Sequence, residues 1–188
     1  MAGKRIFAAI DISDEARGAV VAYVAKLRMD VADIRVGWEK PEKLHLTLKF
    51  FGDVDAARLL RLGTALDEVA TAHKPFVAEL AGTGVFPTAR RPRVLWLGIQ
   101  NDSGRIAKIG DEIERVSSRL GFPREKRPFS PHLTIARIRE PEKGKRLAES
   151  YLQSRFASVE FSVNELVLYE SVLKPAGSTY RVISRHKL

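Results

Sequence analysis

The sequence contains no cysteine, and this absence removes several chemistries at once. Without thiols the chain cannot form disulfide bonds, thiolate metal sites or a cysteine nucleophile. No apolar run is long enough to cross a membrane, and the short apolar run at residues 6–10 is also too short for a signal peptide. We therefore expect a cytoplasmic protein that does not associate with membranes.

Positive charge is what the sequence has in excess. Lys and Arg number 32 against 23 Asp and Glu, so the formal net charge is +9. A basic surface attracts polyanions because their counterions are released on binding. Charge alone leaves RNA, DNA and anionic membranes open as partners. A basic protein without any such partner explains the charge equally well.

Hydrophobic periodicity predicts strands and helices that alternate along the whole chain. Several strands are joined by hairpin-length loops rather than by crossover helices, which favours an α+β fold with antiparallel or mixed sheets. No long linker interrupts the sequence, so we expect one domain over residues 1–188. The expected strands are residues 6–10, 44–50, 76–80, 94–99, 132–138, 159–169 and 179–183, and the expected helices are residues 16–27, 59–69, 106–120 and 147–152.

One short pattern occurs twice. Leu44-His45-Leu46-Thr47-Leu48 recurs as Pro131-His132-Leu133-Thr134-Ile135. Each copy lies in an expected strand between two expected helices, which indicates a duplicated unit with an approximate two-fold axis. Side chains alternate between the two faces of a strand. The His and Thr of each copy therefore share one face, and the aliphatic residues share the face that packs in the core.

Two histidines and two threonines suit phosphoester chemistry, provided that two sheets bring the two copies together across a groove. Imidazole has the side-chain pKa nearest neutrality, so one ring can act as a base while the other acts as an acid. The hydroxyls of Thr47 and Thr134 can hold non-bridging phosphate oxygens. The sequence shows no acidic cluster suited to a metal ion, so we expect neither a metal nor another cofactor.

A single His-x-Thr strand is common and usually structural. Two copies with aliphatic residues at the alternate positions, in a chain with only four histidines, favour a functional role. The other two histidines, His73 and His186, lack this context. We expect both of them to be solvated surface residues.

The repeated motif and several shorter segments resemble the 2H phosphoesterase superfamily, and within it the RNA 2',3'-cyclic phosphodiesterases, also called the 2'-5' RNA ligase family. The resemblance spans nearly the whole chain. It implies a bilobal fold of two interwoven lobes, with two antiparallel or mixed sheets and flanking helices around a central groove. It rests on residues 5–10, 41–52, 86–87, 92–98, 129–137, 168–171 and 177–180.

The resemblance also implies a role for each histidine. His45 would donate a proton to the leaving 3'-oxygen, and His132 would accept a proton from the attacking water, which yields a 2'-phosphate. The sequence itself is symmetrical on this point. The implied partner is an RNA end that carries a 2',3'-cyclic phosphate, such as a tRNA fragment. We expect the protein to be a monomer. Three alternatives stay open: 2'-5' joining of tRNA halves, an RNA-binding module without catalysis, and a metal-dependent hydrolase.

Arg137 ends the second motif, where the family pattern has an arginine that can approach the phosphate. Strand parity places Arg137 on the Leu133 face, opposite His132. It reaches the groove only if the strand ends or bulges first. The sequence leaves a solvent-facing arginine at a strand end as the alternative.

Two basic clusters, residues 90–93 and 124–127, lie in expected loops. They either follow an RNA backbone or face solvent. Among the aromatic residues we expect Phe7 to pack in the core. Trp38 and Phe129 either stack on a base or pack internally.

Overall fold

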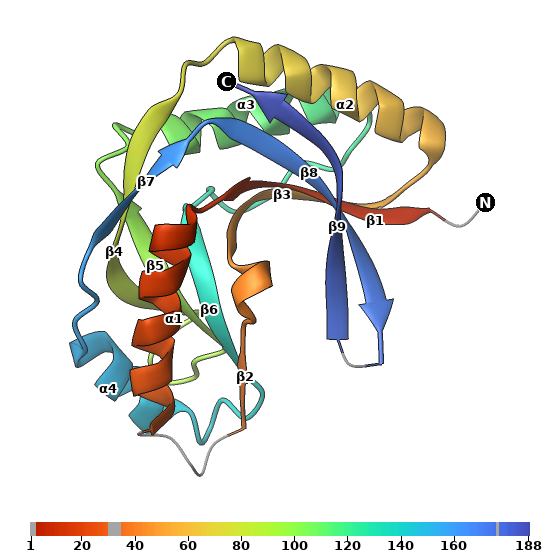
Figure 1. Cartoon of the computed structure of the whole chain (residues 1–188). Helices are drawn as coiled ribbons and strands as arrows, with labels where there is room; N and C mark the ends of the chain where they lie inside the picture. Colours follow the sequence, from red (N-terminus) through yellow and green to blue (C-terminus); the bar gives the residue numbers. More distant parts are fainter. Residues whose placement is uncertain (1–2, 30–34, 176) are drawn as a thin grey trace.

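The computed structural model describes residues 3–29, 35–175 and 177–188, which form an α+β structure with a curled antiparallel sheet (Figure 1). Its strands are β1 (Lys4–Asp11), β2 (Val36–Trp38), β3 (His45–Val54), β4 (Phe76–Phe86), β5 (Val94–Gln100), β6 (His132–Ile138), β7 (Val159–Val163), β8 (Glu165–Lys174) and β9 (Gly177–Lys187). Neighbouring strands in the sheet follow the order β7-β4-β5-β6-β3-β1-β8-β9, and the short β2 pairs with β6.

Helices cover the outer side of the curled sheet (Figure 1). α2 (Ala56–Thr71) and α3 (Arg105–Arg119) pack on each other, with α2 against β8 and β9 and α3 against β3. α1 (Asp14–Met29) contacts β7, and α4 (Lys145–Gln153) contacts β4. The chain therefore crosses between two halves of the sheet, β6-β5-β4-β7 and β3-β1-β8-β9. α1 follows β1 but contacts β7, and α3 follows β5 but contacts β3.

The α+β class and the antiparallel pairing expected from the sequence are confirmed, but the strands of the described residues form one sheet where we expected two. The halves β6-β5-β4-β7 and β3-β1-β8-β9 meet where β3 pairs with β6, with Leu46 opposite Leu133. An unpaired motif strand would present its backbone polar groups at a sheet edge. β3 and β6 meet at this one residue pair, and β2 pairs with β6 at Ala136, Arg137 and Ile138, so both motif strands lie inside one sheet.

The four expected helices are confirmed. The expected strand over residues 159–169 is in fact two strands, β7 and β8, separated at Asn164, and β2 was missed. Side-chain oxygens near two helix starts accept backbone N–H groups there: Ser13 from Ala16, and Asp102 from Ile106. No helix of the described residues is long and apolar enough to span a bilayer.

The prediction that His73 and His186 are solvated was wrong. His186 is 3% exposed, and its Nδ1 lies 2.6 Å from an oxygen of Asp67 on α2. His73 Nε2 lies 2.8 Å from an oxygen of Glu112 on α3. Both rings are enclosed because α2 packs on β9 and on α3, contacts that the local sequence does not reveal.

Candidate active site

The aliphatic residues of both motifs lie in the core, as strand parity predicts. Leu46, Leu133 and Ile135 are fully buried, and Leu48 is 6% exposed. The histidines and threonines are half-buried on the opposite, inner side of the sheet. Each motif therefore places a His and a Thr on an accessible surface whose reverse side is packed in the core.

β6 contains a bulge at Ile135, the last residue of its motif. In the register with β5, Thr134 and Ala136 have successive partners and Ile135 has none. A bulge inserts one residue, which changes the face that the following side chains take. Arg137 therefore lies on the His132 face, has a side chain that is 61% exposed, and lines the groove. β6 thus bulges before Arg137, as it must for Arg137 to reach the groove.

β3 contains a bulge at the equivalent position. In the register with β1, Thr47 and Lys49 have successive partners and Leu48 has none. Phe50 then occupies the position on β3 that Arg137 occupies on β6; it is 68% exposed and lines the groove. The two motif strands thus share a bulge and a groove-facing residue as well as a sequence pattern.

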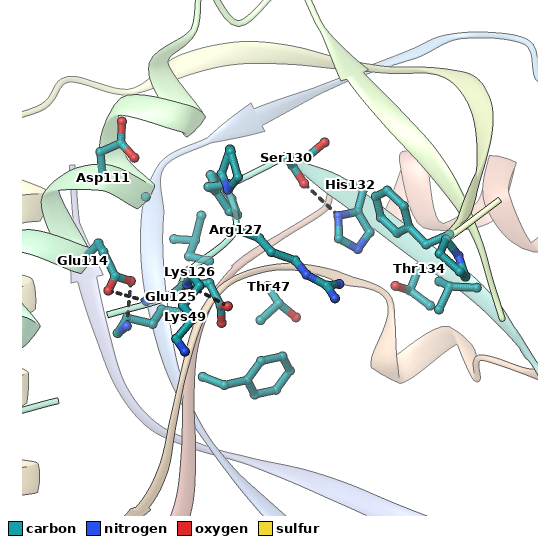
Figure 2. A pocket seen from close by; sticks show the side chains of 18 of the residues that line it. Thr47, Lys49, Asp111, Glu114, Glu125, Lys126, Arg127, Ser130, His132 and Thr134 are labelled. Atoms are coloured by element: carbon teal, nitrogen blue, oxygen red, sulfur yellow. Dashed lines mark hydrogen bonds and ion pairs between the residues drawn. The ribbon is translucent and has the colours of Figure 1, made fainter. Parts of the chain in front are cut away.

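The two motifs converge on one small cavity of about 40 Å³. It opens into a groove of about 1380 Å³, because Thr47, His132 and Thr134 line both spaces; Figure 2 shows these three side chains in the groove. The small cavity is lined by His45, His132, Thr47, Thr134, Glu39, Lys43, Phe50, Arg137 and Tyr180. The structure therefore brings together all five residues that the sequence singled out.

The His132 ring has a defined tautomer. Its Nδ1 lies 2.8 Å from the Ser130 carbonyl oxygen, shown as a dashed line in Figure 2. A carbonyl oxygen only accepts, so Nδ1 donates and carries the proton. Nε2 is then the acceptor nitrogen of the neutral ring. The Phe86 ring lies edge-on to the imidazole, with centroids 5.0 Å apart, and limits its rotation.

The His45 ring is held by a hydroxyl and by aromatic packing. Its Nε2 lies 3.0 Å from Thr47 Oγ1. The Phe7 ring stacks on the imidazole at 5.0 Å, and Tyr180 lies edge-on at 5.3 Å. Phe7 is 1% exposed, which confirms its expected place in the interior. Asp11 is the register partner of His45 on β1, and it accepts a hydrogen bond from Tyr169 at 2.8 Å.

Burial lowers the pKa of both histidines, because the charged imidazolium loses hydration. The pKa of His45 falls to about 4, although the charge of Asp11 and a backbone hydrogen bond at Lys43 raise it. Burial also lowers the pKa of His132; the hydrogen bond to Ser130 raises it, and the charge of Arg137 lowers it. Both rings are therefore neutral at pH 7 in the free protein.

We predict that an NMR titration of the free protein finds His45 mostly neutral at pH 5.5, with a midpoint near 4, and His132 titrating below 6.5. An ordinary imidazole is mostly protonated at pH 5.5. Saturating phosphate should raise both midpoints, since an anion in the cavity stabilises the imidazolium. A His45 midpoint at or above 6.5 without phosphate contradicts this account.

Two cationic side chains, Arg137 and Lys43, line the small cavity. Arg137 Nε donates to Glu39 Oε1 at 3.3 Å, and Lys43 Nζ lies 5.5 Å from the centre of the Tyr180 ring. Their charges favour an anion in the cavity. Within residues 3–29, 35–175 and 177–188, no three His, Asp or Glu side chains gather in a group that could hold a metal ion.

Four cavity residues carried no individual assignment in the sequence: Glu39, Lys43, Phe50 and Tyr180. Lys43 and Phe50 flank the first motif, but only the register with β1 shows that Phe50 faces the groove. Tyr180 comes from the distant β9 strand, which packs beside β8. A signal was present for Tyr180, because the segment at residues 177–180 is part of the family resemblance, although no role was attached to it.

Comparisons with known proteins agree with one another. Residues 19–174 match the family model described as the 2'-5' RNA ligase superfamily. A protein of Methanothermobacter thermautotrophicus named RNA 2',3'-cyclic phosphodiesterase is 35% identical over 179 residues, which cover 94% of each chain. A protein of the same name from Aquifex aeolicus is 34% identical over 155 residues, 80% of this chain and 81% of that one. A crystal structure of a Thermus thermophilus protein superposes with a TM-score of 0.79 at 28% identity and covers 98% of this chain and 97% of that chain.

Proposed function

This chain belongs to the 2'-5' RNA ligase superfamily, and we propose that it is an enzyme that hydrolyses 2',3'-cyclic phosphates at RNA ends to 2'-phosphates. The observation that carries the proposal is the meeting of His45, His132, Thr47 and Thr134 in one cavity. The relatives named RNA 2',3'-cyclic phosphodiesterase support the substrate.

The proposed reaction transfers one proton from water to His132 and one proton from His45 to the leaving oxygen. Nε2 of His132 takes a proton from a water molecule, because its Nδ1 is already protonated and bonded to Ser130. The water oxygen attacks phosphorus as the bond from phosphorus to the 3'-oxygen breaks. His45 donates its proton to that leaving oxygen, and the phosphate stays on the 2'-oxygen. The two rings then exchange protons with water to regenerate the starting state.

The fixed tautomer of His132 supports its role as the base, because Nε2 is its acceptor nitrogen. The charge of Asp11 raises the pKa of His45 and so favours its protonated form, although burial and the charges of Arg17 and Arg137 lower it. Arg137 also lowers the pKa of His132, so it does not distinguish the two rings. The cyclic phosphate brings a negative charge that offsets the cost of burying an imidazolium. With the substrate bound, we propose that His45 holds the proton that the leaving oxygen takes.

The remaining polar groups of the cavity would bind the phosphate. The Thr47 and Thr134 hydroxyls can donate to non-bridging oxygens, and Arg137 can offset the charge that develops on them. Because acid, base and charge stabilisation all come from side chains, we propose a reaction that needs no metal ion. Joining of RNA ends through a 2'-5' linkage would use the same two histidines in the same roles, with a 5'-hydroxyl in place of water as the nucleophile.

We further propose that the chain works as a cytoplasmic monomer and that its single domain arose by duplication into two interwoven lobes. Matching bulges after Thr47 and Thr134 support the duplication. The crossing of α1 and α3 between the halves of the sheet supports the interweaving.

The direct test is a short RNA that ends in a 2',3'-cyclic phosphate, incubated with the protein in EDTA. We expect complete conversion to a 2'-phosphate, identified by ³¹P NMR. A 3'-phosphate product, no product, or turnover that appears only after Mg²⁺ or Zn²⁺ is added would overturn the proposal. A parallel gel with cleaved tRNA halves detects joining, and joining that outpaces hydrolysis would assign the site to the ligase reaction.

A further inference from the structure

The groove is much larger than a terminal phosphate needs, and a basic loop forms one wall of it. We infer that this loop, residues 123–131, binds the backbone phosphates of the RNA strand that leads to the cyclic end. The inference rests on the proposed function, since it extends the same site by one subsite. It assigns a function to one of the two basic clusters of the sequence, residues 124–127.

The loop links α3 to β6 and so leads directly into the second motif. Arg124, Lys126, Arg127 and Ser130 all line the groove together with His132. In Figure 2 the side chain of Arg127 extends from the loop into the groove, toward the space between Thr47 and His132. A strand whose end lies at the two histidines would therefore pass along this loop.

The three cations of the loop are available to a ligand. Arg124, Lys126 and Arg127 are exposed, and within the described ranges none of them has a carboxylate partner within ion-pair distance. Arg91, in the other basic cluster, differs because its Nη2 lies 2.8 Å from Glu142. The lining of the whole groove includes six Lys or Arg against three Asp or Glu, so its net charge is positive. This balance favours a polyanion.

The loop is also fixed in place before any ligand arrives. Nζ of Lys49 donates to the Pro123 carbonyl oxygen at 3.0 Å and to Glu114 at 2.6 Å. Glu114 in turn accepts the backbone N–H of Glu125 at 2.9 Å, and Figure 2 shows this cluster. Binding to a fixed loop costs less conformational entropy than ordering a mobile one.

Packing at the other end of the loop completes the anchoring. The Phe129 ring lies on Gly110 of α3, where a Cβ atom would be 2.7 Å from the ring. Only glycine permits this approach, so Gly110 sets the distance between the loop and the helix. Phe129 thus packs against α3, and it also lines the groove.

Single-stranded RNA fits the groove better than an isolated nucleotide. Backbone phosphates need a row of cations, which the loop supplies, and bases need an exposed aromatic face, which Phe50 of β3 offers in the groove. A nucleoside 2',3'-cyclic phosphate without a 5'-phosphate has nothing to place against Arg124, Lys126 or Arg127. The loop therefore favours oligonucleotide ends over mononucleotides.

The test compares two substrates on the triple variant Arg124→Gln, Lys126→Gln, Arg127→Gln. The substrates are a six-nucleotide RNA that ends in a 2',3'-cyclic phosphate and a nucleoside 2',3'-cyclic phosphate. We expect the ratio of their kcat/KM values to fall about tenfold in the triple variant. Affinity for a fluorescein-labelled six-nucleotide RNA with a 3'-phosphate, measured by anisotropy, should lose about 2 units of its log–log salt slope, or ~0.7 for each phosphate contact.

The matched control removes the same charge elsewhere, as Arg91→Gln, Lys145→Gln, Arg146→Gln. These side chains are exposed or pair outside the groove, so the ratio and the salt slope should keep their wild-type values. If the loop variant keeps the wild-type ratio of kcat/KM values, or if the control variant changes that ratio equally, the inference is overturned. The anisotropy arm needs no turnover, so loss of RNA binding in the loop variant alone supports the subsite even if the hydrolysis test fails.

Discussion

Replacing His132 with alanine is expected to lower kcat for a cyclic-phosphate RNA by roughly 10²–10⁴-fold, the usual effect of losing a positioned proton-transfer group. The ring presents Nε2 as acceptor because Nδ1 donates to the Ser130 carbonyl oxygen at 2.8 Å. His132→Gln fills similar space but offers no group that takes a proton near neutral pH, so it should be as inactive as the alanine variant. Single-turnover kinetics with excess enzyme isolate the chemical step from product release.

His45→Ala should cause a loss of similar size, and the double variant should be little worse than either single variant, because the two groups act in one concerted proton transfer. Full additivity of the two losses would indicate independent roles. His73→Ala is the matched control, since His73 pairs with Glu112 between α2 and α3, away from the cavity lining. Its kcat should stay near the wild-type value. If His45→Ala or His132→Ala folds and keeps near-normal kcat, the two-histidine mechanism is wrong.

The histidine pair could be predicted from the sequence because each motif alternates aliphatic residues with a His and a Thr. Leu46 and Leu133 supply the apolar alternation that fixes strand parity, and parity then places each histidine beside its threonine. These are local properties, and the structure confirms them. The same reasoning put Arg137 on the wrong face, because parity fails at a bulge.

The bulges themselves had no local signal. Neither Leu48 nor Ile135 is a glycine or another residue that marks a bulge, and each is left without a partner only by the register with a strand distant in the sequence. The single sheet could not be predicted for the same reason, since it depends on the pairing of Leu46 with Leu133. Features that depend on which strands become neighbours are the ones that a single sequence does not reveal.

Lys49 illustrates how such a neighbour contact ties the two motifs together. It follows the first motif on β3, yet its Nζ binds Glu114 of α3 and the Pro123 carbonyl oxygen at the start of the loop that leads to the second motif. Parity assigns Lys49 to the face of His45 and Thr47, but the bulge at Leu48 turns it toward α3; it is 7% exposed and still lines the groove. The lysine that follows the first motif thus anchors the loop that precedes the second motif.

Lys49→Met should therefore lower the free energy of unfolding by about 3 kcal/mol, since removal of one partner leaves the Glu114 carboxylate largely buried and uncompensated. Urea denaturation followed by circular dichroism measures the loss. The double variant Lys49→Met, Glu114→Gln should recover most of it, because glutamine removes the charge and keeps an oxygen for the Glu125 N–H. Lys145→Met is the control: its pair with Glu149 is exposed on both sides, and exposed pairs contribute little. A Lys49→Met loss no larger than that of the control, or a double variant less stable than Lys49→Met, would show that the ion pair does not anchor the loop.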